Sequence, residues 1–216
     1  MILMLNCSYK AKASNTEYFF SILKSEIEQM SDREYKVVNL RDVFKGQNFE
    51  NDAIDEFVSD LKKAKALVIG APLYVDGLPA QTVKLMEILK ENYKGELSKL
   101  PVYVISNLGF YEAEQIKHLL AIVENWCKRM GFLYGGGLAL GAGPLIRALE
   151  RMPLKKGVLK AAGLGFEKLA YAVVNRKRMK NYYVRTMIPR IVYMKAAHMN
   201  FDKTAKDNGL KVSEVR

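Results

Sequence analysis

The chain has 216 residues and a formal net charge of +11, and half of its residues are hydrophobic. This length and apolar content suit one α/β domain with a substantial core. Its two cysteines, Cys7 and Cys127, share no metal-ligand spacing, which argues against a zinc site or an iron–sulfur cluster and fits a reduced, cytoplasmic compartment. The uncharged stretch at residues 132–146 is too short and glycine-rich to span a bilayer as a helix, so we expect a soluble protein with no transmembrane segment.

Short apolar runs alternate with amphipathic stretches along the chain. Residues 1–6 read as a buried strand rather than a signal peptide, because no basic region precedes them. Residues 15–30 follow with apolar positions at helical spacing. The same alternation then predicts strands at residues 35–40, 66–71, 100–106 and 132–140, and helices at residues 52–64, 82–89, 112–130 and 154–174.

The five predicted strands are continuously apolar, as in sheets that are buried on both faces. Strands separated by helices form parallel sheets through βαβ crossovers. The sequence therefore predicts an α/β fold with a five-stranded parallel sheet and helices on both faces. Ligands of such sheets bind beyond the carboxyl ends of the strands, so the loops after the first, third and fourth strands are the candidate site.

The loop after the first strand, residues 6–16, is rich in hydroxyl groups and contains two lysines. Ser8, Ser14, Asn15 and Thr16 could each donate a hydrogen bond to a phosphate, and the amino end of a helix favours an anion. The alternative is that Ser14 or Asn15 merely caps the helix. The loop lacks both the Gly-Lys-Ser/Thr ending of a Walker loop and the glycines of the dinucleotide fingerprint.

Two further loops follow the third and fourth strands. In residues 70–81, Pro72, Pro79 and the glycine between them fix an unusual path where a flat ring system could lie against Tyr74. In residues 106–112, an Asn-x-Gly-Phe sequence lets the backbone approach a ligand closely while an aromatic ring flanks it. Each loop alone could be an ordinary connection, but three of them on one sheet edge predict a binding site.

These loops resemble the motifs of the flavodoxin-like NAD(P)H-dependent FMN reductases, over about residues 1–150. That family has a first loop of the form Ser-x-Arg/Lys-x-x-Ser-Asn-Thr, a second of Pro-x-Tyr and a third of Asn-x-Gly-Phe. The matching residues are Ser8, Lys10, Ser14, Asn15 and Thr16, then Pro72, Leu73 and Tyr74, then Asn107, Leu108, Gly109 and Phe110. The chain departs from the family at Tyr9, where many members have proline, and at Lys10, where arginine is usual.

The resemblance implies a flavodoxin-like fold that binds FMN and uses NAD(P)H as electron donor. The residues expected to hold the FMN phosphate are Ser8, Lys10, Ser14, Asn15 and Thr16. Those expected around the flavin ring are Pro72, Leu73, Tyr74 and Val75 on one side and Asn107, Gly109 and Phe110 on the other.

No catalytic side chain is expected, because flavin enzymes leave the chemistry to the cofactor. His118, His198 and both cysteines are interpreted as structural or solvated. The resemblance implies an oxidoreductase that passes hydride from NAD(P)H to FMN and on to a quinone, an azo or nitro compound, or a flavin, and it suggests a homodimer. Two alternatives are an FMN electron carrier with no NAD(P)H site and a flavin-free interaction module.

Residues 151–216 carry 16 Lys/Arg against 4 Asp/Glu, whereas the remainder of the chain is nearly neutral. We expect a flavodoxin-like domain at residues 1–180 and a basic, helical extension at 181–216, with a helix that starts near Pro189. The favoured interpretation is a docked helix with a solvated basic face. Its alternatives are attraction of the NADPH phosphate or of an acidic redox partner, then membrane-surface contact, and last nucleic acid, for which no binding motif is present.

Overall fold

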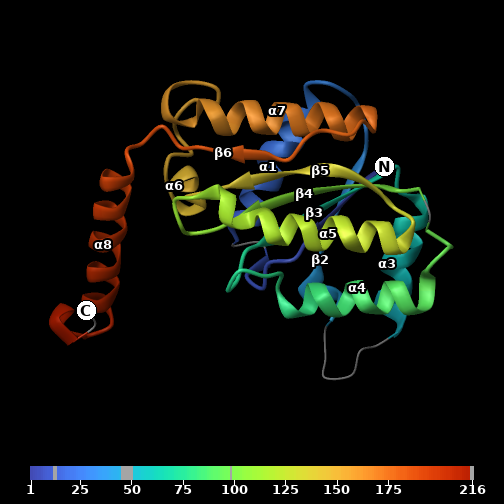
Figure 1. Cartoon of the computed structure of the whole chain (residues 1–216), viewed down its shortest axis with the longest axis horizontal. Helices are drawn as coiled ribbons and strands as arrows, with labels where there is room; N and C mark the ends of the chain where they lie inside the picture. The colour runs from blue at the N-terminus through green and yellow to red at the C-terminus, as the bar shows by residue number, and fades with distance from the viewer. Residues whose placement is uncertain (12–13, 45–50, 98, 215–216) are drawn as a thin grey trace.

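One sheet of six parallel strands organises the chain, in the order β2–β1–β3–β4–β5–β6 (Figure 1). The computed structural model describes residues 1–11, 14–44, 51–97 and 99–214. The strands are β1 (Ile2–Asn6), β2 (Tyr35–Asn39), β3 (Ala66–Pro72), β4 (Pro101–Asn107), β5 (Leu133–Leu140) and β6 (Tyr182–Val184). The five predicted strands are present and parallel, as the sequence indicated.

The prediction of five strands was wrong by one strand. β6 pairs in parallel with Leu138–Leu140 of β5 and extends the sheet at that side. It contains three residues, which is too short a run for strand periodicity to stand out after the basic residues 176–180. β6 lies within the range that we expected to be helical, 181–216; the division into a domain and an extension at residue 180 stays a prediction.

Helices cover both faces of the sheet (Figure 1). Their bounds are α1 (Asn15–Glu28), α2 (Leu40–Val43), α3 (Asn51–Lys63), α4 (Ala80–Tyr93), α5 (Lys117–Met130), α6 (Gly143–Ala148), α7 (Lys160–Asn175) and α8 (Arg190–Asp207). Short 3₁₀ turns precede α5 and α7 and follow α8, at Ala113–Ile116, Gly157–Leu159 and Val212–Glu214. α2 and α6 are too short to have been predicted from periodicity.

Successive side chains of each inner strand enter opposite layers of the core. In β1, Leu3 and Leu5 pack with the apolar side chains of α3, α4 and α5, whereas Ile2 and Met4 pack with those of α1 and α7. Burial on both faces explains why the inner strands are apolar without alternation. All seven residues of β3 are buried.

Three consecutive glycines in β5 allow neighbouring side chains and the segment after α7 to lie close to this strand. A Cβ on Gly135 would lie 2.3 Å from the ring of Tyr103, and one on Gly136 would lie 2.4 Å from the carbonyl oxygen of Met179. Gly136 also has a φ of 110°, in the region that favours glycine, and the β4–β5 register shifts beside it. The segment after α7 is therefore held close against β5.

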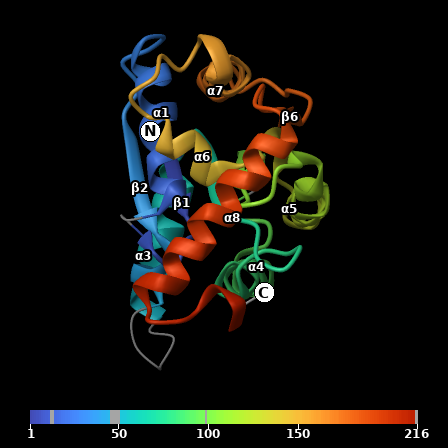
Figure 2. The ribbon, with the colours of Figure 1, turned by 90° about the vertical axis from the view of Figure 1, so that its left-hand side faces the viewer.

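Helix α8 crosses the carboxyl edge of the sheet (Figures 1 and 2). It begins at Arg190, directly after Pro189, and of its side chains only Tyr193 and Ala205 are buried. Several of its apolar side chains, including Ile191, Met199 and Phe201, are exposed. Among the described helices, none combines the length and the apolar character needed to cross a membrane.

Candidate functional site

The three candidate loops meet at the carboxyl edge of the sheet. The backbone N–H of Leu73, just after β3, donates to the carbonyl oxygen of Asn107 at 2.8 Å. The Asn107 side chain in turn lies within hydrogen-bonding distance of the Thr16 hydroxyl in α1, with Nδ2 and Oγ1 3.5 Å apart. The structure thus brings together residues from all three loops that the sequence singled out.

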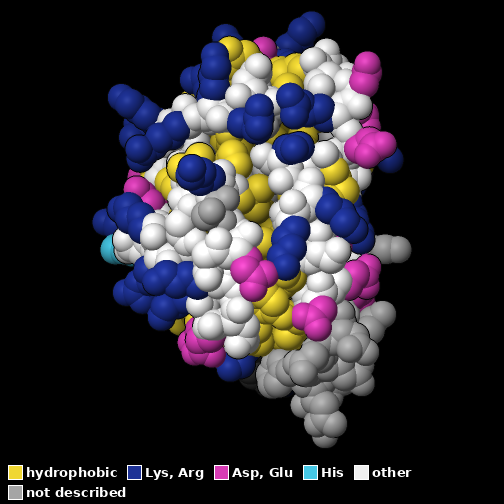
Figure 3. All heavy atoms as spheres, turned by 90° about the vertical axis from the view of Figure 1, so that its right-hand side faces the viewer, with side chains coloured by type: hydrophobic (Ala, Val, Ile, Leu, Met, Phe, Trp, Pro, Cys, Tyr) yellow, Lys and Arg dark blue, Asp and Glu magenta, His cyan; other side chains and the backbone are white. Residues whose placement is uncertain are grey.

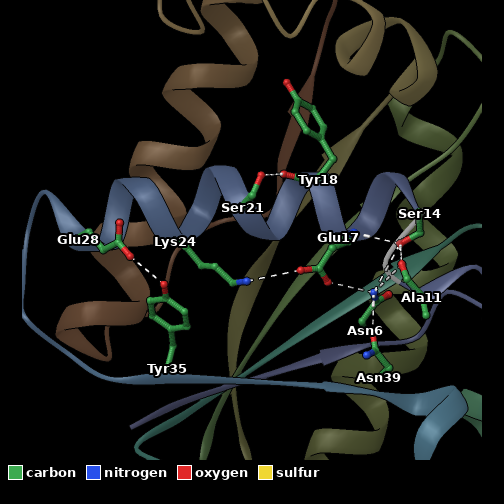
Figure 4. A network of polar contacts seen from close by, with 10 residues as sticks. All are labelled: Asn6, Ala11, Ser14, Glu17, Tyr18, Ser21, Lys24, Glu28, Tyr35 and Asn39. Carbon is green, nitrogen blue, oxygen red and sulfur yellow. Dashed lines mark hydrogen bonds and ion pairs between the residues drawn. The ribbon is translucent and has the colours of Figure 1, made fainter.

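Asn6, at the end of β1, organises the first loop (Figure 4). Its side-chain nitrogen donates to the carbonyl oxygen of Ala11 and to Oδ1 of Asn39, both at 3.2 Å, and its Oδ1 accepts from the backbone N–H of Ser8 at 3.0 Å. The loop then folds back through a hydrogen bond from Ala11 N–H to the Ser8 carbonyl oxygen at 3.0 Å. A buried side chain therefore fixes the backbone that leads into α1.

Ser14 caps α1, the alternative that the sequence left open. Its hydroxyl oxygen accepts from the Glu17 N–H at 3.1 Å and donates to the Ala11 carbonyl oxygen at 2.5 Å. Among the described residues, the backbone N–H groups of Asn15 and Thr16 have no acceptor. The start of this 14-residue helix therefore presents free amides and the positive end of the helix dipole to an anion.

Thr16 lies in the first turn of α1 with its side chain packed toward the sheet, and its predicted role at the phosphate stays a prediction. Its side chain is buried, and its Cγ2 lies 2.6 Å from the position that a Cβ on Gly70 would occupy. Its hydroxyl faces Asn107 instead of solvent. Ser8 is also buried, but its hydroxyl has no hydrogen-bond partner within the described part of the chain and remains available as a donor.

Cations surround the start of α1. Lys10 is exposed on the loop, and the Arg41 guanidinium lies over the Tyr9 ring, 5.5 Å from its centroid. Arg147 of α6 donates from Nη1 to Oδ1 of Asn15 at 3.4 Å. The sequence did not identify Arg41 or Arg147, because both come from short helices that periodicity does not reveal.

The second loop is a tight hairpin turn. The N–H of Tyr74 donates to the Gly77 carbonyl oxygen and the N–H of Gly77 to the Tyr74 carbonyl oxygen, each at 3.0 Å. Val75 and Asp76 between them have φ values of 46° and 60°, the pattern of a type I′ turn. Pro72 is buried in β3, but Tyr74 is half exposed and Val75 fully exposed, so these two side chains form the accessible surface of the loop.

The third loop is joined to α8. The Tyr193 hydroxyl donates to the carbonyl oxygen of Gly109, and the Tyr111 hydroxyl donates to that of Ile188 at 2.8 Å. The Tyr111 and Tyr193 rings lie 5.7 Å apart between centroids. Phe110 remains 67% exposed. α8 is therefore anchored to the loop in which the flavin ring was expected.

An ion pair adds to this anchor. Arg190, the first residue of α8, approaches Glu112 to 2.7 Å between Nε and Oε1. The hydrogen bond from the guanidinium lowers the pKa of the Glu112 carboxyl below its ordinary value. Both side chains are largely exposed, so the pair orients α8 more than it stabilises the fold.

The donor set fits a phosphate attached to an aromatic ring. Free amides, a free hydroxyl and Lys10 lie on the first loop, with arginines of α2 and α6 beside it. An exposed tyrosine, valine and phenylalanine lie on the second and third loops. No group of three His, Cys, Asp or Glu residues that could hold a metal occurs in the described ranges. Burial raises the pKa of the Cys7 thiol to about 12, so this thiol beside the loop is not an activated nucleophile.

Solved structures with this fold include several that are named as reductases or oxidoreductases. A structure titled flavone reductase matches with a TM-score of 0.61 and 9% identity over 83% of this chain, which spans 66% of that protein's length. An NADH:FMN oxidoreductase in its apo form matches with a TM-score of 0.61 and 12% identity, covering 88% of this chain and 97% of that one. An NADPH-quinone reductase from P. pentosaceus matches with a TM-score of 0.53 and 16% identity, covering 78% and 95%. At these identities the likeness establishes the fold.

Sequence comparison identifies the family. No curated protein matches the chain. Residues 1–134, more than half of the 216, match the profile of the family described as NADPH-dependent FMN reductase. The match confirms FMN and NAD(P)H as the cofactor and electron donor that the resemblance implied. The chain belongs to the NADPH-dependent FMN reductase family.

Proposed function

We propose that this chain transfers two electrons from NAD(P)H, through FMN held at the carboxyl edge of the sheet, to a small acceptor such as a quinone, an azo or nitro compound, or a free flavin. One observation carries the proposal. The three loops are joined by hydrogen bonds between Leu73 and Asn107 and between Asn107 and Thr16. This supports a phosphate site beside exposed aromatic side chains; the donors at the start of α1 and on the loop before it are called the cradle below.

The cradle would bind the FMN phosphate. The amides of Asn15 and Thr16 and the hydroxyl of Ser8 would donate to its oxygens, and Lys10 would contribute positive charge. Ser14 would act through the backbone position that its cap fixes, since its hydroxyl already has three partners. Hydrogen bonds from amides to a charged phosphate are stronger than those between neutral groups.

The ring would lie between the second and third loops. Tyr74 and Val75 would border it on one side, with Asn107, Gly109 and Phe110 on the other. The chemistry that FMN supplies when bound is the exchange of a hydride equivalent between NAD(P)H and an acceptor. The chain would orient the ring and limit access to it, because α8 crosses this edge and contacts the Gly109 carbonyl through Tyr193.

The test begins with titration of FMN into the purified chain, followed by flavin fluorescence. Mixing the loaded protein anaerobically with NADPH or NADH should bleach the flavin absorption, and a quinone, azo or nitro compound should restore it. Absence of FMN binding would leave the interaction module as the better interpretation. Binding without bleaching by either nucleotide would favour the electron carrier.

A matched pair of serine variants locates the site. Ser8→Ala removes a free hydroxyl at the cradle, whereas Ser21→Ala removes one further along α1 that bonds only to its own helix, at the Tyr18 carbonyl. A hydrogen bond to a charged group contributes about 1.5–3 kcal/mol, so Ser8→Ala should raise the Kd for FMN about 10- to 100-fold. An equal Kd in both variants would contradict the proposed phosphate site. The homodimer stays a prediction, which sedimentation would check.

A further inference from the structure

A second concave site lies along the β6 side of the sheet, between α7 and the segment that leads into β6. α7 forms one wall and residues 177–182 form the other, and the volume between them is about 790 Å³. Figure 3 shows the face toward the amino ends of the strands, where Lys and Arg side chains lie around exposed hydrophobic ones. The volume falls in the range of small-molecule sites, about 300–1,000 Å³. The proposed oxidoreductase mechanism uses none of these residues.

The surface of the groove is mostly apolar. Met30 and Leu164 are 39% and 38% exposed, and Tyr171 is 51% exposed, which is unusual for three large apolar side chains on one surface. Met179 and Tyr182 lie partly buried among the core side chains of α1 and α7 and also line the groove. A chain of methylene groups would cover surface that is now in contact with water.

The wall made by residues 177–182 is held in place by the sheet. The Tyr103 hydroxyl donates to the Lys177 carbonyl oxygen at 2.9 Å, and the Met179 N–H donates to the Gly135 carbonyl oxygen at 2.8 Å. Asn181 then accepts through Oδ1 from the Gly137 N–H at 3.0 Å. Because these bonds involve buried strands, the groove is preformed and needs little ordering to bind a ligand.

The rim of the groove carries unneutralised positive charge. Lys168 and Lys177 lie over tyrosine rings, 4.6 Å from the Tyr182 centroid and 5.6 Å from that of Tyr171. Neither of them, nor Lys180, has a carboxylate partner in the described part of the chain. Arg178 also lines the groove and approaches Glu124 at 3.8 Å.

Acidic charge at the groove is already neutralised. Glu167 is the one acidic side chain among the described lining residues, and it pairs with Lys155 at 3.6 Å. Net positive charge beside an apolar surface selects a ligand with an anionic head and an apolar body.

We propose that this groove binds a single-chain anionic amphiphile, such as an alkyl carboxylate or alkyl phosphate. The apolar chain lies along Leu164, Tyr171 and Met179, and the head group meets Lys168 and Lys180. A bilayer fits less well, because the apolar side chains line a hollow between two walls and a flat membrane surface does not enter a hollow. The site takes a ligand from solution.

The experiment uses the full chain with FMN added, and sodium dodecanoate below its micellar concentration as the probe. Calorimetry measures affinity, and amide chemical shifts locate the site. We expect saturable binding with shifts at residues 164–182, weakening in salt, and at least about tenfold weaker binding of uncharged dodecanol. Lys168→Gln combined with Lys180→Gln should weaken dodecanoate binding about five- to tenfold.

The matched control removes two exposed lysines from α8, through Lys195→Gln with Lys203→Gln, and should leave the affinity unchanged. Dodecyl phosphate tests the other head group, and vesicles of phosphatidylglycerol test a bilayer. Equal weakening in both double variants, shifts confined to α8, binding of vesicles without binding of either monomeric probe, or no binding at all would each overturn the proposal. Flavin absorption reports separately on FMN, so failure of this site is distinguishable from failure of the FMN site.

Discussion

Gly70 offers a direct test of how the sheet positions the phosphate loop. It lies near the carboxyl end of β3, in register with Asn6 of β1. A Cβ added here would lie 2.5 Å from Cζ of Phe20 and 2.6 Å from Cγ2 of Thr16, both in the first half of α1. Contacts this short force the two side chains, and with them the first turns of α1, to shift. Gly70→Ala should therefore displace the start of α1.

The expected cost follows from overpacking a close-packed layer. An inserted methyl group of this kind costs about 1–3 kcal/mol, which corresponds to a fall in Tm of about 2–12 °C for a domain of this size. The affinity for FMN should fall with it, because the displaced turn contains the amides of Asn15 and Thr16. Urea unfolding followed by circular dichroism measures the first effect, and fluorescence titration with FMN the second.

Gly109→Ala is the matched control for stability. A Cβ at Gly109 would meet no atom within 4 Å, so this variant should unfold within about 0.5 kcal/mol of the parent chain. Phe20→Leu should lower the free energy of unfolding less in the Gly70→Ala variant than in the parent chain. The reason is that the smaller side chain relieves the contact with the added methyl group. Equal stability of Gly70→Ala and Gly109→Ala would refute the reasoning.

Three further predictions concern the turn, α8 and the thiols. Val75→Asn should raise the free energy of unfolding by about 1 kcal/mol, measured in urea, because asparagine tolerates the positive φ of this exposed turn better than valine. Tyr193→Phe should lower the free energy of unfolding by about 1 kcal/mol and speed amide exchange in α8, because the hydrogen bond to the Gly109 carbonyl oxygen is lost. Burial raises the pKa of Cys7 and of Cys127 to about 12, so neither thiol should react with a disulfide reagent at pH 8 until urea unfolds the chain.

The raised thiol pKa values also predict how the stability of the fold changes at alkaline pH. Above pH 9, the ordinary thiol pKa, the unfolded chain loses thiol protons while the folded chain keeps them until about pH 12. The unfolded state then binds fewer protons, so stability should fall as pH rises through this window. Rapid labelling of the native chain at pH 8 would contradict the thiol prediction. An unchanged urea midpoint would contradict the one for Val75→Asn, and unchanged α8 exchange the one for Tyr193→Phe.

The main strands and helices were predictable because their signal is local. A continuous apolar run such as residues 66–71 indicates a strand buried on both faces, whatever the rest of the chain does. β6 and α6 were not predictable, because runs of three and six residues carry no periodicity. The Gly-Pro pair at residues 143–144 was the one local sign of α6, since proline favours the first turn of a helix.

The candidate site also has features that the sequence predicted and features that it did not. The three loops were found because parallel strands separated by helices have their carboxyl ends at one edge of the sheet. The orientation of the Thr16 hydroxyl was not, because it depends on how closely α1 packs on Gly70. The approach of Arg147 to Asn15 joins residues 132 positions apart, and the contact of Tyr193 with Gly109 joins residues 84 apart. No spacing within one segment encodes such contacts.

The short strand β6 has a consequence for association. Without it, β5 would be the last strand of the sheet, and its unpaired backbone groups at Leu138–Leu140 could recruit a strand from another molecule. β6 covers them, and the charged residues Lys180 and Arg185 on either side discourage pairing at the new border. A border strand of three residues that is flanked by basic side chains is a poor template for a strand of another molecule. This effect depends only on where the charges lie along the chain.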